Sequence, residues 1–313
     1  MKILMFGRGT IAALYGWAFE KAGHEVDFYV RPGRAAQFGP EISLEIRDGR
    51  KKGAAVAERW PVTLREELDA GHDYDLILLS VNPGQLDAAV EFLGTRVGGA
   101  TVLMFGNMFE DPAAVVSALP ADQVVWGFPG GGGGFTGSRL AGGVMKAVFL
   151  GFCDSSNRGA RYRAVRGLFQ DAGFSVTQAP DFRSWLWFHY ILDAGLLAKV
   201  LSAGGLAGFL GSRAAIGESV LLVREMVPLL EAKGGTPRIG AKLMSRVPVG
   251  LLSFVLQKAL GGDNMAAFLF EQLERTGQMS RELAGLYARD VLAEARRLGV
   301  RLPRLEALEP AFA

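Results

Sequence analysis

The chain opens with an apolar pattern that predicts a strand, a tight turn, a helix and a second strand. Lys2–Phe6 is a short, mostly apolar run, typical of a buried parallel strand. Gly7–Ala12 follows at once with the spacing G-x-G-x-x-A, and Thr10–Ala22 has the length and composition of a helix. Gly23 ends that helix, and Glu25–Val30 returns to a strand pattern.

Strand and helix patterns alternate as far as residue 150, which predicts an open, doubly wound parallel sheet of the Rossmann type. The predicted strands are Leu76–Val81, Thr101–Phe105, Val124–Phe128 and Gly143–Leu150, and the predicted helices are Thr63–Ala70, Gln85–Gly94 and Pro112–Leu119. The glycine-rich segment Pro129–Gly134 has no Gly-Lys-Ser/Thr after it, so it is not a P-loop. We expect it to be a flexible, close-packed segment near the ligand.

The second half of the chain is predicted to be helical. After one short extended segment at Phe174–Val176, only helical patterns remain. The predicted helices are Asn157–Ala172, a long helix after an N-cap at Asp181 through Leu201, Ser212–Gly234, Arg238–Leu260 and Arg281–Gly299. The division that we predict is a dinucleotide-binding domain at residues 1–178 and an all-helical domain at residues 179–313.

Composition narrows the class of protein further. The 313 residues are half hydrophobic and carry a net charge of only +2 with no basic block, which argues against a nucleic-acid partner. Cys153 is the single cysteine and the three histidines are scattered, so no metal site is expected. No apolar stretch is long enough to span a membrane, and Met1 leads directly into a strand, which predicts a cytoplasmic protein. Apolar helix faces make a homodimer plausible.

The glycine turn has the chemistry of a dinucleotide site. Gly7 permits the tight turn, Gly9 leaves room for a pyrophosphate, and Ala12 lets the helix pack close to the strand. Thr10 and Ile11 begin the helix, where free N–H groups and the positive end of the helix dipole favour phosphate. The alternative is a plain structural turn without a ligand.

The residues after the second strand indicate which dinucleotide is bound. An NAD site usually has Asp or Glu there to accept from the ribose 2′-hydroxyl. This chain has Arg31 and Arg34, whose guanidinium groups suit a 2′-phosphate. We therefore predict NADP(H), with solvated loop arginines as the alternative.

Two further loops are expected beside the turn, because ligands bind beyond the carboxyl ends of parallel strands. Val81 and Asn82 end one strand, and Gly106-Asn107 follows the next. Asn107 is a candidate to bind the nicotinamide ribose or the substrate, and a loop-capping asparagine is equally consistent with the pattern. Asn82 precedes a proline, so ordinary turn chemistry also explains it.

The whole chain resembles the ketopantoate reductase family. The resemblance is carried by KILMFGRGTIAALYGWAFEKAGHEV, Arg31, DLILLSV, GFPGGGGG, DAGFSV and SWLWFHY. It implies a helical domain like the C-terminal domain of 6-phosphogluconate dehydrogenase, and NADPH-dependent reduction of a 2-keto acid between the two domains. It also implies that Gly7, Gly9, Ala12 and Arg31 contact the cofactor.

This sequence departs from the family pattern at the positions of its lysines. Asn82 stands where the family usually has a lysine, and Gly106-Asn107 reverses its Asn-Gly order. On the long helix, His189 and Asp193 occupy the places of the catalytic lysine and the asparagine after it, while Glu282 aligns near the acidic residue that holds the substrate hydroxyl, with a shift of one residue.

Carbonyl reduction needs a proton donor, and His189 is the candidate. A histidinium can stabilise the developing alkoxide, and Asp193, four residues on, shares its helix face and can orient the ring. The alternative is that His189 only packs among the aromatic residues Trp185, Trp187 and Phe188. Two other functions remain open: an imine-reducing or opine-type dehydrogenase, and a non-enzymatic NADPH-binding protein.

Overall fold

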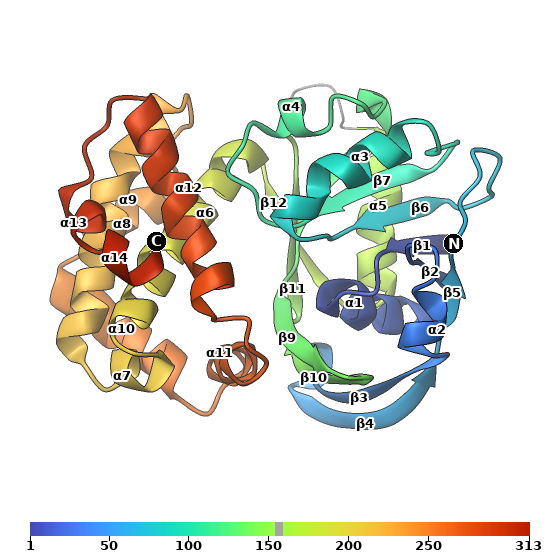
Figure 1. Ribbon diagram of the computed structural model, residues 1–313, viewed down its shortest axis with the longest axis horizontal. Helices are drawn as coiled ribbons and strands as arrows, with labels where there is room; N and C mark the ends of the chain where they lie inside the picture. Colours follow the sequence, from blue (N-terminus) through green and yellow to red (C-terminus); the bar gives the residue numbers. More distant parts are fainter. Residues whose placement is uncertain (154–158) are drawn as a thin grey trace. The chain divides into compact units, whose positions relative to one another are not determined.

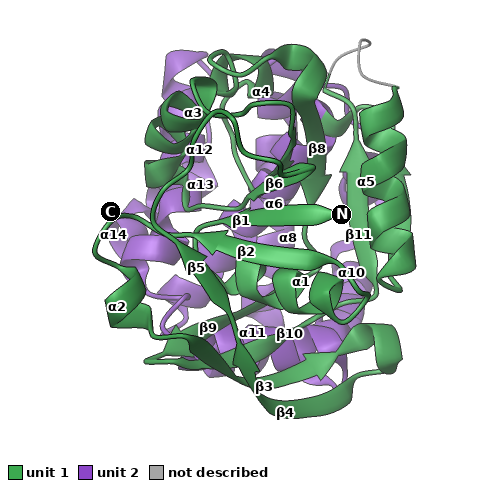
Figure 2. Ribbon diagram, turned by 90° about the vertical axis from the view of Figure 1, so that its right-hand side faces the viewer, with its two compact units in different colours: residues 1–182 green, residues 183–313 purple. Residues whose placement is uncertain are grey.

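The computed structural model describes residues 1–153 and 159–313, which form two compact units. Unit 1 comprises Met1–Phe182 and unit 2 comprises Arg183–Ala313 (Figures 1 and 2). Unit 1 combines sheets with helices, and the described part of unit 2 contains helices and no strand. The predicted fold class, a Rossmann-type domain followed by a helical one, is confirmed.

Unit 1 is built on an eight-stranded sheet with the order β12-β11-β8-β7-β6-β1-β2-β5. Its strands are β1 (Lys2–Phe6), β2 (Glu25–Tyr29), β5 (Thr63–Arg65), β6 (Leu76–Leu79), β7 (Thr101–Phe105), β8 (Val124–Phe128), β11 (Ala147–Gly151) and β12 (Ser175–Ala179). Neighbours are parallel except at the β8–β11 pair. The strand order reverses beside β1, because the chain goes from β1 to β2 on one side and later to β6 on the other. Such a switch point is where doubly wound sheets bind ligands.

Helices cover both faces of the large sheet. They are α1 (Thr10–Glu20), α2 (Ala35–Phe38), α3 (Leu86–Gly94), α4 (Pro112–Val115) and α5 (Ala160–Asp171). On one face, Tyr15 of α1 contacts Phe105 of β7 and Phe169 of α5. On the other face, Phe6 and Tyr29 contact Phe92 of α3. The predicted first residues of α5 include positions outside the described ranges.

A second sheet of four strands lies against α1, with the order β4-β3-β10-β9. Its strands are β3 (Glu41–Asp48), β4 (Ala54–Pro61), β9 (Gly131–Thr136) and β10 (Arg139–Val144). Helix α1 contacts β1 and β2 on one side and β9 and β10 on the other, so it lies between the two sheets (Figure 1). Sequence analysis did not predict the β3–β4 hairpin, although every second residue of β3 is buried.

The segment Pro129–Gly134 is close-packed, as expected, but it is largely a strand and not the flexible segment that was predicted. Gly131–Gly134 belong to β9, which pairs antiparallel with β10. A side chain at Gly133 would collide with the backbone of Ala141 and Gly142, and Gly133 has a φ of +136°. The glycines therefore allow two strands to approach closely. The predicted single strand Gly143–Leu150 is also two strands, β10 and β11, in different sheets.

The predicted helix Thr63–Ala70 was wrong as well. Thr63–Arg65 is an edge strand paired with β2, and the residues after it form no helix. Its polar residues face solvent, while Leu64 packs against the core cluster. An edge strand of three residues is too short to show the alternation that distinguishes a strand from a polar helix.

The four helices predicted for unit 2 lie close to their predicted positions, with one break. The helices of this unit are α6 (Phe182–Ser202), α7 (Leu206–Leu210), α8 (Arg213–Ala232), α9 (Ile239–Arg246), α10 (Val249–Gly261), α11 (Met265–Arg275), α12 (Arg281–Arg297), α13 (Pro303–Ala307) and α14 (Glu309–Phe312). Of these, α7, α11, α13 and α14 were not predicted. The predicted helix Arg238–Leu260 is divided, because Val247 precedes Pro248 and takes an extended backbone. Within the described ranges no single helix has the length and apolar character to cross a membrane; α9 and α10 meet that test only as a pair, bent by 119°.

A buried ion pair links the small sheet to the helices of unit 1. The side chain of Asp48 is fully buried, and its two oxygens accept bonds of 2.9 Å from Arg50 Nε and Nη2. Arg50 also donates to the Ala172 carbonyl at 2.8 Å and lies 5.0 Å from the Trp17 ring. The pair therefore joins β3, α1 and the end of α5.

We predict that Arg50→Met destabilises the protein by about 3 kcal/mol, because it leaves a buried carboxylate without its cation. The urea midpoint of unfolding measures the change. Arg139→Met is the matched control, since Arg139 and Glu45 form an exposed pair worth less than about 1 kcal/mol. Equal midpoints for the two variants would show that the buried pair does not hold unit 1 together.

A second charged cluster makes the stability of unit 2 depend on pH. Glu294 accepts from Arg297 Nε at 2.6 Å and from Lys233 Nζ at 2.7 Å. The hydrogen bond from Arg297, with that from Lys233, lowers the pKa of Glu294 from 4.5 to about 2. A carboxyl group with a lowered pKa in the folded state stabilises the fold above its unfolded pKa, and that stabilisation is lost as protons bind.

We therefore expect wild type to exceed Glu294→Gln in stability by about 2 kcal/mol at neutral pH. The difference should shrink as the pH falls from about 4.5 toward 2. Urea titrations across that range measure it. Glu271→Gln, which removes an exposed partner of Arg275, is the control and should change stability by less than about 0.5 kcal/mol. A difference that stays constant with pH would contradict the assignment.

Candidate functional site: an arginine-lined pocket at the switch point

A pocket of about 530 Å³ lies at the carboxyl ends of β1, β2 and β6, entirely within unit 1. Its position follows from the strand order, because the loops after β1 and β6 diverge there. The pocket is lined by Phe6, Gly7, Arg8, Gly9, Tyr29, Val30, Arg31, Arg34, Phe38, Ser80, Val81, Asn82, Gly84, Gln85, Ala88, Ala89 and Phe92.

The glycine turn forms one wall of this pocket. Gly7 has a φ of +96°, and its N–H donates to the Tyr29 carbonyl at 2.9 Å, which ties the turn to β2. Gly9 is the N-cap residue of α1, and a Cβ built on it meets no atom within 4 Å. The first turn of α1 carries no acidic side chain, and no side chain caps it. The helix therefore presents its first N–H groups beside open space, an arrangement that favours an anion.

The charge of the lining is positive. Among the described lining residues are three arginines, Arg8, Arg31 and Arg34, and no carboxylate. Glu66 fixes the loop that carries Arg31 and Arg34, since its carboxylate accepts from the Ala35 N–H at 2.7 Å. That backbone bond, with others from the same loop, lowers the pKa of Glu66. The Glu66 carboxylate therefore stabilises the loop, while Arg31 and Arg34 line the pocket.

Two buried polar residues of the lining, Arg8 and Ser80, were not predicted from the sequence. The side chain of Arg8 is buried and its Nε has no hydrogen-bond partner, and the buried Oγ of Ser80 also has none. Buried polar atoms are normally paired, so two such atoms on one pocket wall indicate a polar ligand. Arg8 lies inside the G-x-G motif, where its charge was a signal in the sequence. Ser80 gave no comparable signal.

An aromatic cluster forms another part of the lining. The rings of Phe6 and Tyr29 stack at 4.8 Å, and Phe92 of α3 lies 5.1 Å from Tyr29. Burial raises the pKa of the Tyr29 phenol above its ordinary value. The pocket thus joins an apolar surface to a cationic one, as a nucleotide with a flat base and phosphates requires.

Of the other residues predicted to bind the cofactor, some line the pocket and some do not. Val81 and Asn82 line the pocket, with Asn82 exposed before the short turn that leads into α3. Thr10, Ile11 and Ala12 begin α1 and are outside the lining, and Ala12 is buried in the core cluster. Asn107 follows β7 and does not line the pocket either.

The close approach of α1 to the sheet occurs at Gly16 as well as at Ala12. A Cβ on Gly16 would lie 3.0 Å from the Phe28 ring and 3.3 Å from the Met5 side chain. Any larger residue would push the helix away from β1 and β2. Gly16 therefore helps to hold the helix start in place beside the pocket, a role that the motif alone did not reveal.

In unit 2, His189 and Asp193 lie on one face of α6. His189 Nε2 is 3.6 Å from Asp193 Oδ2, and the two side chains are 31% and 27% exposed. The imidazole stacks on the Trp185 ring at 5.2 Å with an angle of 11° between the planes. Trp187, by contrast, is almost fully buried, unlike the partly exposed His189. The histidine is thus oriented by an aromatic plane and a carboxylate while part of it remains accessible.

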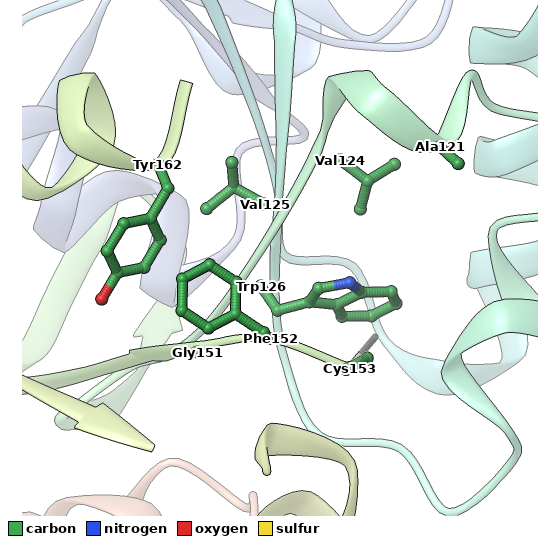
Figure 3. Close-up of a pocket in the computed structure, with 8 residues that line it drawn as sticks. All are labelled: Ala121, Val124, Val125, Trp126, Gly151, Phe152, Cys153 and Tyr162. Atoms are coloured by element: carbon green, nitrogen blue, oxygen red, sulfur yellow. The ribbon is translucent and has the colours of Figure 1, made fainter. Parts of the chain in front are cut away.

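A second cavity, beside β8 and β11, is too small for a substrate. Its volume is about 10 Å³, the space of a single water molecule. Figure 3 shows Trp126, Phe152 and Tyr162 around it, with Cys153 at its edge. The pocket at the switch point is therefore the candidate site for a ligand of unit 1.

Comparison with known proteins supports the resemblance stated above. Residues 3–140 match the family model described as ketopantoate reductase PanE/ApbA. A 2-dehydropantoate 2-reductase of Vibrio cholerae serotype O1 is 25% identical over 194 residues, which cover 60% of this chain and 58% of that protein. The matched part thus spans less than two thirds of the relative's length.

Solved structures share the fold over the whole chain. A 2-dehydropantoate 2-reductase from Geobacter metallireducens GS-15 superposes with a TM-score of 0.70 at 17% identity, covering 100% of this chain and 99% of that one. A ternary structure of D-mandelate dehydrogenase with NADH and anilino(oxo)acetate has a TM-score of 0.71 at 15% identity, covering 100% and 97%. The described fold is the fold of these reductases and dehydrogenases.

Proposed function

We propose that this chain, whose residues 3–140 match the family model described as ketopantoate reductase PanE/ApbA, is an NADPH-dependent reductase of a small 2-keto acid. The observation that carries the proposal is the pocket at the switch point, with its glycine turn, three arginines and no carboxylate in the described lining. A carboxylate would select the ribose hydroxyl of NAD, whereas guanidinium groups select a 2′-phosphate.

The residues of the pocket fit this cofactor. The open space beside Gly9 and the free N–H groups of α1, beginning at Thr10 and Ile11, would hold the pyrophosphate. Arg31 and Arg34 would hold the 2′-phosphate, and Val81 and Asn82 would border the rest of the dinucleotide. The unpaired Ser80 Oγ offers a further hydrogen bond. NADPH bound there supplies a hydride to a carbonyl carbon.

The protein must also supply a proton and stabilise the alkoxide that develops on the carbonyl oxygen. We assign both tasks to His189, which Asp193 and the Trp185 ring orient. The imidazolium donates its proton to the oxygen, and the neutral ring then regains a proton from water. Asn107 is proposed to position the nicotinamide ribose or the substrate.

The names of two similar proteins support the proposed substrate class. The Vibrio relative is named for 2-dehydropantoate, and the D-mandelate dehydrogenase structure holds anilino(oxo)acetate together with NADH. The first name denotes a 2-oxo acid, and the second denotes a carboxylate with an adjacent oxo group that belongs to an amide. We propose that this chain reduces an oxo acid too, with NADPH in place of NADH because of the arginines.

Absorbance of NADPH, followed with a panel of 2-keto acids, tests the proposal. We expect oxidation with at least one keto acid alone. Oxidation that needs an added amine would instead assign an imine-reducing, opine-type activity. Tight NADPH binding without oxidation by any member of the panel would favour a non-enzymatic binding protein and contradict the proposed reductase.

A further inference from the structure

Arg8 is the buried one of the three pocket arginines, and the proposed function gives it no individual role. Its side chain is 7% exposed, yet it lines the pocket. One guanidinium nitrogen donates to the Glu41 carbonyl at 3.2 Å, and Nε has no partner. The guanidinium carbon lies 5.1 Å from the Phe38 ring and 4.9 Å from the Phe135 ring. Two aromatic rings and a carbonyl therefore fix the group in place and leave part of its hydrogen-bonding capacity free.

A second guanidinium meets the same ring. Arg34 lies 5.1 Å from the centre of Phe38, the distance at which Arg8 lies. The two cations are therefore no farther apart than twice that distance. Arg8 contacts an acidic residue, Glu41, but it donates to the backbone carbonyl of that residue. The Glu41 carboxylate instead forms an ion pair with Arg59 at 3.2 Å. Two positive charges are gathered around one aromatic ring without a carboxylate between them.

This arrangement costs free energy in the absence of an anion. Like charges repel, and burial alone lowers the pKa of Arg8 because it disfavours the charged form. An anion that accepts hydrogen bonds from both guanidinium groups offsets both penalties, because such charge-assisted bonds are strong. The site is thus preorganised for a compact, doubly charged anion.

We propose that Arg8 and Arg34, held by Phe38, form a clamp for the 2′-phosphate of NADPH, with Arg8 as its buried, specificity-determining member. The inference rests on the proposed function, because it assigns a role in binding that cofactor. The 2′-phosphate is the phosphate concerned, since Phe38 and Glu41 belong to the segment after β2, the strand whose end reads the ribose 2′ position. The pyrophosphate has its own site at the start of α1.

Two small nucleotides isolate this phosphate: adenosine 2′,5′-bisphosphate carries it and AMP does not. Titration calorimetry with both probes compares wild type with Arg8→Met, which keeps the apolar stem and removes the charge. We expect Arg8→Met to bind the bisphosphate about ten- to a hundredfold more weakly, the value of one or two charge-assisted hydrogen bonds. Its AMP affinity should stay within about twofold of wild type.

Two further variants complete the test. Arg139→Met removes an exposed arginine of the same unit that does not line the pocket, and both affinities should be unchanged. Arg34→Met removes the less buried member of the clamp and should show the same selective loss as Arg8→Met. It keeps the test valid if thermal unfolding shows that Arg8→Met is misfolded.

An equal loss of both probes in Arg8→Met would place Arg8 at another phosphate and overturn the inference. Unchanged affinities would overturn it too, since Arg8 would then only brace the turn. A wild type that binds neither NADPH nor NADH would overturn the proposed function itself. Failure of the proposed function can be distinguished from failure of the Arg8 inference, because the first is seen with the wild-type protein alone and the second only with the variants.

Discussion

His189→Ala is expected to lower kcat for carbonyl reduction by about 10²- to 10⁴-fold, the usual contribution of a general acid. The affinity for NADPH should stay within about twofold of wild type, because His189 is not among the residues that line the proposed nucleotide pocket. Stopped-flow measurement of single-turnover rates separates the chemical step from binding. The Asp193 carboxylate, 3.6 Å from the ring, orients the imidazole, so Asp193→Asn should lower kcat less, by about tenfold.

A purely structural role of His189 makes different predictions. The ring stacks on Trp185, so a packing role would change the unfolding temperature and leave the rate of the folded protein intact. His189→Lys is the informative variant: it loses the stacked ring but restores a cationic proton donor, and we expect it to recover much of the rate. His24→Ala, a histidine outside both sites, is the control for the loss of an imidazole. Full turnover in His189→Ala at every pH would contradict the assignment.

Gly9→Val is expected to abolish NADPH binding without unfolding the protein. Gly9 has an ordinary φ of −78°, and a Cβ at this position meets no atom within 4 Å, so the fold accepts a side chain there. The new methyl groups would occupy the space beside the start of α1 that we assign to the pyrophosphate. We expect the affinity for NADPH to fall at least a thousandfold, about 4 kcal/mol. The turn is fixed, so it cannot move to relieve the steric overlap between the valine side chain and a phosphate.

The control for this substitution is Gly71→Val. Gly71 also has open space around it, but it lies in a turn outside the pocket. Calorimetry should show wild-type affinity for Gly71→Val and no heat for Gly9→Val, while both variants unfold near the wild-type temperature. NADPH binding by Gly9→Val with near-normal affinity would mean that the pyrophosphate lies elsewhere.

Sequence patterns predicted the central strands of the large sheet well, for a physical reason. β1, β7 and β8 are buried on both faces, so they appear as uninterrupted apolar runs with clear limits. The small sheet lacks that signal. Gly131–Gly134 form a strand only because the backbone of β10 comes close to them, a long-range contact that no local propensity encodes. Pro248, by contrast, was a local signal for the break between α9 and α10.

The candidate site was predictable only in part. The G-x-G-x-x-A spacing and the two arginines after β2 are local, so Gly7, Gly9, Arg31 and Arg34 were named, and the pocket brings these four together. Arg8 acquires its significance from Phe38 and from Phe135, which is more than a hundred residues away. Burial and an unpaired nitrogen are properties of the folded chain, and the sequence does not display them.

The most direct test of the central claim is the affinity for NADPH and NADH, measured by calorimetry on wild type and Arg31→Ala side by side. A pocket that holds a 2′-phosphate between guanidinium groups predicts a strong preference for NADPH in wild type. The preference should fall by about tenfold or more in Arg31→Ala, with NADH affinity almost unchanged. Equal affinity for both nucleotides in wild type, or no binding of either, would contradict the claim that this pocket is an NADPH site.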